Sequence, residues 1–434
     1  MQRQIDDALV SWKDSDQRKP LLVRGARQVG KSYSIAAFGR GHFDRLVELN
    51  LERNSSAHRA FGEDLDARKL VGALEVITGT RIEAGNTLLF LDEIQACPRA
   101  ITALRYLYEE LPGLHVVAAG SLLELAMGDE AFPVGRLQTM EMHPLSLVEF
   151  ALALDNRPAA EILQDRPRTL SESVHDSLLE LLRTYCFVGG MPESVADYAE
   201  HRSLQRCAQI LDGLRETFRQ DFPKYSKRAN LDCLGAVLES APAFVGQQLK
   251  YARLTDCGTG PTVKRAVELL EKARLLARVR ASGAGGLPLG AGASVERFKA
   301  IMLDVGLWQR LAGVRADREL AAADLLDVHR GAMAEQYVGQ EILAERGGGL
   351  HYWSREARGS QAEVDYLVEV GGDIYGVEVK SGAAGHLRSL HLLLAEHPNV
   401  RGGWVFSSRP YRELPEQRLT FLPIYYAGAA VMER

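Results

Sequence analysis

Short apolar runs alternate with amphipathic stretches over the first third of the chain. Four of these runs have the length and aliphatic content of buried strands, at residues 21–24, 45–49, 88–91 and 115–119. Helical patterns lie between them. Strands that alternate with helices predict an α/β domain built on a mostly parallel sheet. The apolar run 148–152 marks its end, so we place this first domain at residues 1–155.

The rest of the chain divides into three further predicted segments. Residues 156–220 contain helical stretches, interrupted by Gly-Gly-Met-Pro at 189–192, and predict a helical lid or linker. Residues 221–312 predict a compact helical module in which Thr262 caps the longest helix. Residues 313–434 read as a helix, strands, a helix and a strand, as in a second α/β domain. The helices and the strand expected in the middle module are 231–240, 245–252, 262–279 and 298–303.

Composition is that of a globular protein. The chain has 434 residues, of which 46% are hydrophobic, so it can bury several cores. Lys+Arg 52 against Asp+Glu 57 gives a net charge of −5, so any contact with nucleic acid depends on a local basic patch. The sequence has no apolar leader and no long apolar run, and we expect a cytoplasmic protein without membrane contact. The five cysteines are scattered without a CxxC pair, which argues against both a disulfide framework and a zinc site.

A glycine-rich sequence follows the first predicted strand and begins a helix. It fits the phosphate-binding pattern GxxxxGK[ST] without a mismatch. Successive backbone N–H groups and a helix N-terminus would hold the phosphates of ATP, while Lys31 adds a positive charge and the Ser32 hydroxyl is a ligand for Mg²⁺. The alternative, a chance glycine-rich turn, is disfavoured by the strand before it and the helix after it. The predicted nucleotide-binding residues are Gly25, Ala26, Arg27, Gln28, Val29, Gly30, Lys31, Ser32 and Tyr33.

Acidic and polar residues follow the later strands. Asp92 and Glu93 come directly after the run 88–91, at the sheet edge where nucleotides bind. We expect Asp92 to hold Mg²⁺ and Glu93 to orient the attacking water, although a strand followed by solvated acids has the same pattern. Ser121 ends the next strand and is placed to contact the γ-phosphate or the water. Arg136 is the candidate for an arginine that acts on a neighbouring subunit, which implies a homo-oligomer; the alternative is an ordinary surface arginine.

Basic residues outnumber acidic residues between positions 250 and 280, with eight Lys and Arg against three Asp and Glu. In the predicted helix 262–279, the residues Lys264, Arg265 and Lys272 lie off the apolar face. A basic helix after a short helix pair, followed by a turn and a strand, is typical of a winged helix that contacts DNA phosphates. A helical bundle with a solvated charged face fits the same pattern, and both interpretations stay open.

The C-terminal segment predicts a β-hairpin with charged residues on one face. Alternation places Glu363 beside Asp365 on one strand and Glu378 beside Lys380 on the next. This D…ExK arrangement is similar to the PD-(D/E)xK nuclease pattern, here without the proline, and Glu335 on a preceding helix would add a third acid. Such a site would hold Mg²⁺ and hydrolyse a phosphodiester. The other interpretations are a degenerate fold that binds nucleic acid without cleaving it and a module that docks to a protein.

Several of these sequences together resemble one group of bacterial and archaeal AAA-type ATPases that carry a C-terminal domain of unknown function. The resemblance covers nearly the full length. It implies a P-loop fold with an additional strand, a winged-helix-like middle and a restriction-endonuclease-like end. No second sensor arginine is identifiable in the lid segment. The sequences that carry the resemblance are GARQVGKS at 25–32, LLFLDEIQ at 88–95, AAGS at 118–121, GR at 135–136 with HPLS at 143–146, GGMP at 189–192 and KAIMLDVGL at 299–307.

Three functional hypotheses follow. The first is an ATP-hydrolysing AAA-type protein that acts on DNA and carries a nuclease-like module. The second is an ATP-regulated, Mg²⁺-dependent DNA nuclease. The third is an ATP-dependent switch that binds a protein partner without nucleic acid.

Overall fold

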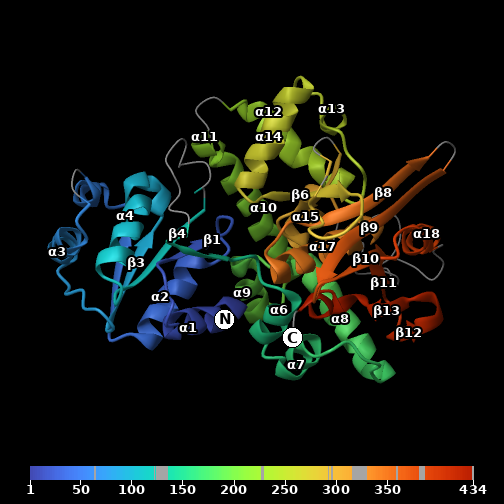
Figure 1. Ribbon diagram of the computed structural model, residues 1–434, viewed down its shortest axis with the longest axis horizontal. Helices are drawn as coiled ribbons and strands as arrows, with labels where there is room; N and C mark the ends of the chain where they lie inside the picture. Colours follow the sequence, from blue (N-terminus) through green and yellow to red (C-terminus); the bar gives the residue numbers. More distant parts are fainter. Residues whose placement is uncertain are drawn as a thin grey trace. The chain divides into compact units, whose positions relative to one another are not determined.

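The computed structural model describes residues 1–62, 65–121, 123, 135–225, 229–291, 293–294, 297–314, 330–357, 360–380 and 387–432 (Figure 1). The chain divides into two compact units. We call Met1–His143 the N-terminal unit and Pro144–Arg434 the C-terminal unit. This unit boundary lies before the expected domain end at residue 155, and the apolar run 148–152 lies in a helix of the second unit.

The N-terminal unit is built on a five-stranded sheet in the order β2-β3-β4-β1-β5, and all pairs are parallel. β4 lies between β1 and β3, which is the additional-strand arrangement that the resemblance implied. The four predicted strands are confirmed. The fifth, β5, was not predicted because its four residues are largely polar and alternate in exposure. The strands are β1 Leu21–Arg24, β2 Arg45–Asn50, β3 Thr87–Asp92, β4 His115–Gly120 and β5 Gln138–Glu141.

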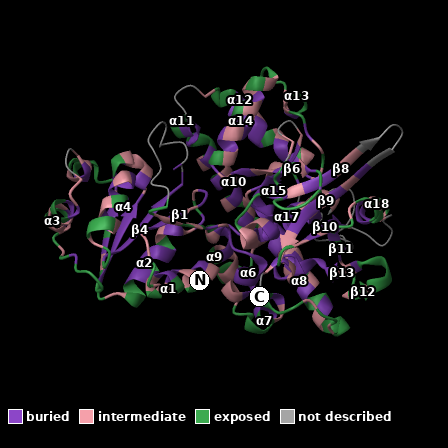
Figure 2. Ribbon diagram, viewed as in Figure 1, coloured by how far each residue is buried: buried purple, intermediate pink, exposed green. Residues whose placement is uncertain are grey.

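Helices cover both faces of this sheet. Alternate residues of β2, β3 and β4, such as Leu89 and Leu91, form one core with α3 and α4. Leu88 points to the opposite face, where it approaches Gly39 of α2. The central strands are consequently buried throughout (Figure 2). The helices are α1 Gln4–Asp14, α2 Lys31–His42, α3 Ala67–Thr78 and α4 Pro98–Glu110, with short 3-10 turns η1 Ser55–Phe61 and η2 Ile94–Ala96.

The C-terminal unit begins with helices and no strand, as predicted for 156–220. The middle segment follows with further helices, and a bridge between Leu249 and Phe298 joins it to a later strand. The first helices are α6 Leu147–Ala153, α7 Arg157–Gln164, α8 Glu172–Val188, α9 Pro192–His201, α10 Leu204–Gln220 and α11 Phe222–Tyr225. Those of the middle are α12 Leu231–Ser240, η3 Ala241–Phe244, α13 Tyr251–Leu254 and α14 Gly260–Lys272.

Three predictions for the middle segment are wrong. The predicted helix 262–279 ends at Lys272, because Arg274 adopts a left-handed backbone (φ 61°) and the residues after it form a strand. The residue before this helix is Thr259, so Thr262 is not its cap. The predicted helix 245–252 reduces to α13, because Leu249 is used in the bridge to the sheet.

An eight-stranded mixed sheet forms the core of the C-terminal unit, in the order β12-β13-β11-β10-β9-β8-β6-β7 (Figure 1, yellow to red). β6 and β7 come from the middle segment, so the expected boundary at residues 312/313 does not separate two sheets. The predicted hairpin is present as the antiparallel pair β9–β10. The strands are β6 Leu276–Ser282, β7 Phe298–Met302, β8 His351–Ala357, β9 Ser360–Val370, β10 Asp373–Val379, β11 Val400–Ser407, β12 Arg412–Leu414 and β13 Leu419–Pro423. The helices that accompany them are α15 Val305–Leu311, α17 Arg330–Arg346, α18 Arg388–Glu396, η4 Pro415–Gln417, η5 Ile424–Tyr426 and η6 Ala429–Val431.

Two of the sequence motifs meet inside this unit. The backbone N–H of Gly190 donates to Oδ1 of Asp304 at 2.6 Å, and that of Leu307 donates to Oδ2 at 2.9 Å. Gly189 has φ 73°, and a Cβ on it would lie 2.3 Å from the same carboxylate. The GGMP and DVGL sequences therefore form one buried junction. Burial raises the pKa of Asp304 to about 6, against the backbone donors that lower it.

Cys233 and Cys257 form a disulfide. The sequence argued against a disulfide framework and did not indicate this single pair, which α12 and the turn before α14 bring together from positions 24 residues apart. The other three cysteines are buried and take no part in a disulfide. Among the described residues, no helix is both long enough and apolar enough to cross a membrane.

Candidate functional site

The phosphate loop connects β1 to α2. Gly30 precedes the helix with φ 95° and Gln28 has φ 66°, so the loop turns sharply and the first N–H groups of α2 are left for a ligand. The Lys31 ammonium donates to the carbonyl oxygens of Gly25 at 3.0 Å and Ala26 at 2.7 Å. Lys31 is therefore held over the loop that its charge would serve. The loop residues Ala26 and Val29 are buried, whereas Tyr33 is 65% exposed.

Ser32 meets Asp92 at the carboxyl end of β3. Its hydroxyl lies 3.0 Å from both carboxylate oxygens of Asp92, and Asp92 is only 6% exposed. The side-chain amide of Asn50, at the end of β2, donates to Oδ2 of Asp92 at 3.1 Å. A hydroxyl beside a carboxylate, oriented by an amide, is a donor set that fits Mg²⁺. Asn50 was not predicted, because nothing in its local sequence distinguishes it.

Glu93 and Ser121 lie at the same sheet edge. Glu93 has a left-handed backbone (φ 49°), which is uncommon outside glycine, and its carboxylate accepts the amide of Gln95. Ser121 Oγ and Gln95 Oε1 are buried and have no hydrogen-bond partner among the residues the structure describes. Buried polar atoms normally have partners. A phosphate group with its water, bound at this edge, would supply them, so the residues fit a nucleotide with Mg²⁺.

Arg3 is a positioning residue that sequence analysis missed. It lies just before α1 and is 7% exposed. Its guanidinium donates to the carbonyl of Val29, inside the phosphate loop, at 3.0 Å and to that of His143 at 2.7 Å. Arg3 thus ties the loop to the end of the N-terminal unit. No sequence signal could have indicated contacts 26 and 140 residues away.

Arg136 is not part of the phosphate site of its own chain. It precedes β5, whose first residue, Gln138, pairs with Leu21 at the start of β1. The phosphate loop follows the carboxyl end of β1. Arg136 therefore lies near the amino ends of the parallel strands, away from the loop. Its guanidinium pairs with Glu109 of α4 at 3.1 Å. The same glutamate pairs with Arg105, and Arg99 donates to the carbonyl of Phe61.

This geometry agrees with the comparison to known families. Residues 17–151 match the AAA domain family. The N-terminal unit is thus an AAA-type P-loop domain. Residues 179–318 and 330–425 match two families that are described only as domains of unknown function. No curated protein sequence matches the chain.

Three solved structures are similar to the chain at low identity. The Aeropyrum pernix ORC1 protein in complex with DNA is 14% identical, over 73% of this chain and 92% of that one, with a TM-score of 0.31. C. elegans PCH-2 is 14% identical, over 46% and 62%, with a TM-score of 0.26. Drosophila ORC bound to DNA is 13% identical, over 71% and 94%, with a TM-score of 0.25.

Beyond the AAA domain, the C-terminal unit brings three of the four predicted acidic residues together around a lysine that was not predicted to join them. Lys299 of β7 places its ammonium 3.4 Å from Oε2 of Glu335, 2.5 Å from Oε1 of Glu363 and 3.2 Å from Oδ1 of Asp365. We call these four residues the acidic centre. Lys380 pairs instead with Glu378, at 2.5 Å. The hairpin prediction thus places the acids correctly, but their central cation comes from another strand.

Burial and mutual repulsion dominate the electrostatics of this region. Burial, reinforced by Asp365 and opposed by Lys299, raises the pKa of Glu335 to about 8. The same effect of burial and of Asp365, opposed by Lys380, raises the pKa of Glu378 to about 7. Burial would lower the pKa of Lys299, but the three carboxylates outweigh it and raise that pKa well above its usual value.

Basic residues occupy two places in the C-terminal unit. On α14, the predicted contacts Arg265 and Lys272 are exposed and Lys264 is half-buried. A separate cleft of about 660 Å³ opens beside Glu363 of the acidic centre. We call it the basic cleft. Its charged lining residues, of which Arg297 and Arg355 were not singled out from the sequence, are Lys250, Arg253, Arg297, Arg355 and Glu363.

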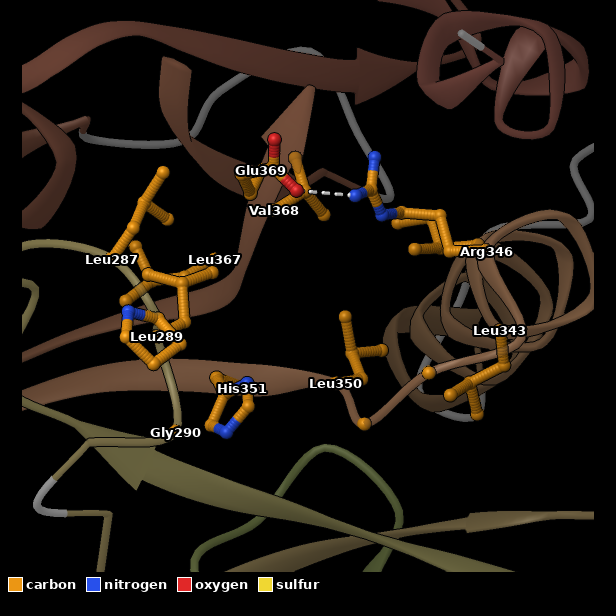
Figure 3. Close-up of a pocket in the computed structure, with 14 residues that line it drawn as sticks. Leu287, Leu289, Gly290, Leu343, Arg346, Leu350, His351, Leu367, Val368 and Glu369 are labelled. Atoms are coloured by element: carbon orange, nitrogen blue, oxygen red, sulfur yellow. Dashed lines mark hydrogen bonds and ion pairs between the residues drawn. The ribbon is translucent and has the colours of Figure 1, made fainter. Parts of the chain in front are cut away.

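A further cavity of about 510 Å³ lies between α17, β8 and β9 (Figure 3). Its lining is mainly apolar, with leucines on both sides. Arg346 and Glu369 pair with each other in this lining, where the guanidinium donates to the carboxylate at 2.6 Å. Because these two opposite charges pair with each other, the cavity offers less to an anionic ligand than the basic cleft does.

Proposed function

We propose that this protein binds and hydrolyses ATP with Mg²⁺ through its AAA domain. The observation that carries the proposal is the meeting of the phosphate loop with the Ser32–Asp92 pair, whose hydroxyl and carboxylate lie 3.0 Å apart. The loop amides and Lys31 would hold the β- and γ-phosphates, and Ser32 and Asp92 would hold the ion. Mg²⁺ supplies neutralisation of the charge that develops on the phosphates.

The remaining residues of this edge have separate roles in the proposal. Glu93 would orient the attacking water and accept its proton, since a carboxylate at this edge faces the end of the triphosphate. Its left-handed backbone fixes the direction of the side chain. Ser121 would donate to a γ-phosphate oxygen or to the water. Arg136, which lies at the other edge of the sheet, would act only on the nucleotide of a neighbouring copy in a homo-oligomer.

An ATPase assay with four variants tests this proposal. We expect Lys31→Ala to lose ATP binding, and Glu93→Gln to bind ATP while turnover falls at least about a hundredfold. Arg40→Ala, at the exposed far end of α2, is the matched control and should behave as wild type. Arg136→Ala should retain ATP binding and lose turnover only if subunits assemble. Wild-type hydrolysis by Lys31→Ala would refute the assignment of the loop.

We propose further that the C-terminal unit associates with DNA through phosphate contacts. The order α12, the bridged residue Leu249, α13, α14 and the antiparallel pair β6–β7 is that of a winged helix, which supports this role. Arg265 and Lys272 lie seven positions apart on α14, close to two helical turns, so they share a face. The basic cleft is a second candidate surface for phosphate.

Binding of a labelled DNA duplex at increasing salt tests the association. Phosphate contacts predict a steep fall of affinity with salt, and the double variant Arg265→Glu with Lys272→Glu should weaken binding at least about tenfold. Arg253→Glu tests the basic cleft separately. Salt-independent binding, or no binding at low salt, would favour the alternative of an ATP-dependent switch with a protein partner.

The alternative of a Mg²⁺-dependent nuclease finds less support. Asp365, Glu378 and Lys380 lie together on the hairpin, as that alternative requires, but Lys299 stands among the carboxylates. Incubation of plasmid and linear DNA with Mg²⁺ or Mn²⁺ tests cleavage directly. Cleavage that Asp365→Ala abolishes would restore this alternative.

A further inference from the structure

Lys299 makes the acidic centre complete without any other cation. Its side chain is 1% exposed, and its ammonium has three N–H donors. One carboxylate oxygen from each of Glu335, Glu363 and Asp365 lies within 3.4 Å of it. The number of donors therefore equals the number of carboxylates that surround it.

The outer oxygens of two of these carboxylates are also engaged. Oε2 of Glu363 accepts the side-chain amide of Gln248 at 2.7 Å, and Oδ2 of Asp365 accepts the backbone N–H of Val379 at 2.8 Å. A divalent cation binds carboxylate oxygens at about 2.0–2.6 Å and would occupy the space that the ammonium fills. It would have to expel a buried lysine and leave that charge without partners. Among the described residues, no group of His, Cys, Asp and Glu is arranged to hold a metal ion.

Lys299 reaches the acids from a strand that does not pair with theirs, since β6 and β8 lie between β7 and β9 in the sheet order. β7 lies at one edge of the eight-stranded sheet, and β9 carries Glu363 and Asp365 in its interior. The Lys299 ammonium also lies 5.6 Å from the ring of Tyr352 on β8, the strand next to β9. The long side chain thus crosses toward the acids beneath an aromatic ring, where water is excluded.

We propose that the Lys299 ammonium is the permanent cation of the acidic centre, that the centre therefore takes no divalent cation, and that truncation of Lys299 converts it into a divalent-cation site. The acidic centre is then a metal-independent module, and a phosphodiester held in the adjoining basic cleft is bound without being cleaved there. The claim about the cation of the acidic centre does not depend on the proposed ATPase function. The claim about the phosphodiester rests on the proposed association with DNA.

Mn²⁺ binding to the nucleotide-free full chain, followed by the electron paramagnetic resonance signal of the free ion, tests the proposal. Asp92→Asn is introduced into every sample to remove the carboxylate that we assign to Mg²⁺ in the AAA domain. With Lys299 intact we expect no stoichiometric Mn²⁺ binding. Adding Lys299→Ala should create a site for about one Mn²⁺ per chain, and adding Asp365→Asn to that variant should abolish it. Lys272→Ala, which removes an exposed lysine, is the control and should create no site.

Two results would overturn the proposal. One is Mn²⁺ binding by the chain with Lys299 intact that is lost on adding Asp365→Asn, since the lysine would then yield to the metal. The other is a folded Lys299→Ala variant, by circular dichroism, that gains no Mn²⁺ site. If Lys299→Ala does not fold, the comparison of Asp92→Asn with and without Asp365→Asn decides alone: absence of binding in both supports the proposal. DNA affinity measured with and without EDTA, in the absence of nucleotide, tests the metal-independent module, and equal affinities are expected.

Discussion

Replacing Gly190 by alanine places a methyl group where the backbone of another segment passes. The new Cβ would lie 2.2 Å from the carbonyl oxygen and 2.9 Å from the nitrogen of Leu145. Ordinary contacts begin at 3.4 Å, so the two backbone segments must separate by more than an ångström. The same movement stretches the 2.7 Å hydrogen bond from the Leu145 N–H to the Gly190 carbonyl and the 2.6 Å bond to Asp304.

The expected loss of stability follows from these contacts. Overpacking in a buried site costs about 1–3 kcal/mol, and a broken buried hydrogen bond adds about 1–3 kcal/mol. We therefore expect the free energy of unfolding of the C-terminal unit to fall by about 3 kcal/mol. At roughly 2–4 °C per kcal/mol, the Tm of that unit should fall by about 6–12 °C.

Differential scanning calorimetry of the full chain measures this effect. Gly213→Ala is the matched control, because Gly213 lies exposed in the middle of α10 and a Cβ there meets nothing within 4 Å. That substitution should stabilise by about 0.5–1 kcal/mol through helix propensity. If Gly190→Ala unfolds within a degree of wild type, the junction is not the tight contact that the structure describes.

Three further predictions concern single side chains. Arg3→Ala should weaken ATP affinity about tenfold, because the phosphate loop loses the donor to the carbonyl of Val29; titration with a fluorescent ATP analogue measures this, and unchanged affinity would contradict it. Asn50→Leu should raise the Mg²⁺ concentration for half-maximal ATPase activity about tenfold, because Asp92 loses an orienting donor, and an unchanged requirement would count against that role. Burial raises the pKa of Glu341 to about 8, so the folded state holds a proton that the unfolded state releases near pH 4.5, and stability falls as pH rises between these values. Glu341→Gln should remove this slope, worth at most roughly 5 kcal/mol at about 1.4 kcal/mol per pKa unit, and urea unfolding of both proteins from pH 5 to 8 measures the difference; parallel pH profiles would contradict it.

Short sequence motifs were sufficient to predict those features whose residues lie close together in the chain. The phosphate loop, the strand before Asp92 and the hairpin of Asp365 each depend on residues within a few positions of one another, so their spacing in the sequence carries their geometry. Even for the hairpin, the sequence places the acids side by side but does not indicate which cation contacts them. Lys299 lies 36 positions from Glu335 and 66 from Asp365. Contacts of that range depend on the order of strands in the sheet, which one sequence does not reveal.

The misassigned helix 262–279 illustrates the same limit. Its apolar positions keep helical spacing past Lys272, and its residues include good helix formers. The strand β6 forms because its backbone pairs with β7 and β8, which come from distant parts of the chain. Tertiary pairing overrides local propensity at such positions. Arg274, whose left-handed backbone separates the helix from the strand, is neither glycine nor proline. The sequence therefore gives no sign of the break.

The shared sheet also determines where this polypeptide can be divided. β6 and β7 fall inside the matched region 179–318 and the other six strands inside 330–425, yet all eight belong to one hydrogen-bonded sheet. A fragment that starts at residue 330 would leave the backbone of β8 without its partner β6, and such an exposed edge strand favours aggregation. The same fragment would lack Lys299, so three acidic residues would lose their ammonium partner. We therefore expect recombination or subcloning to exchange the C-terminal unit as one piece, from residue 144 onward.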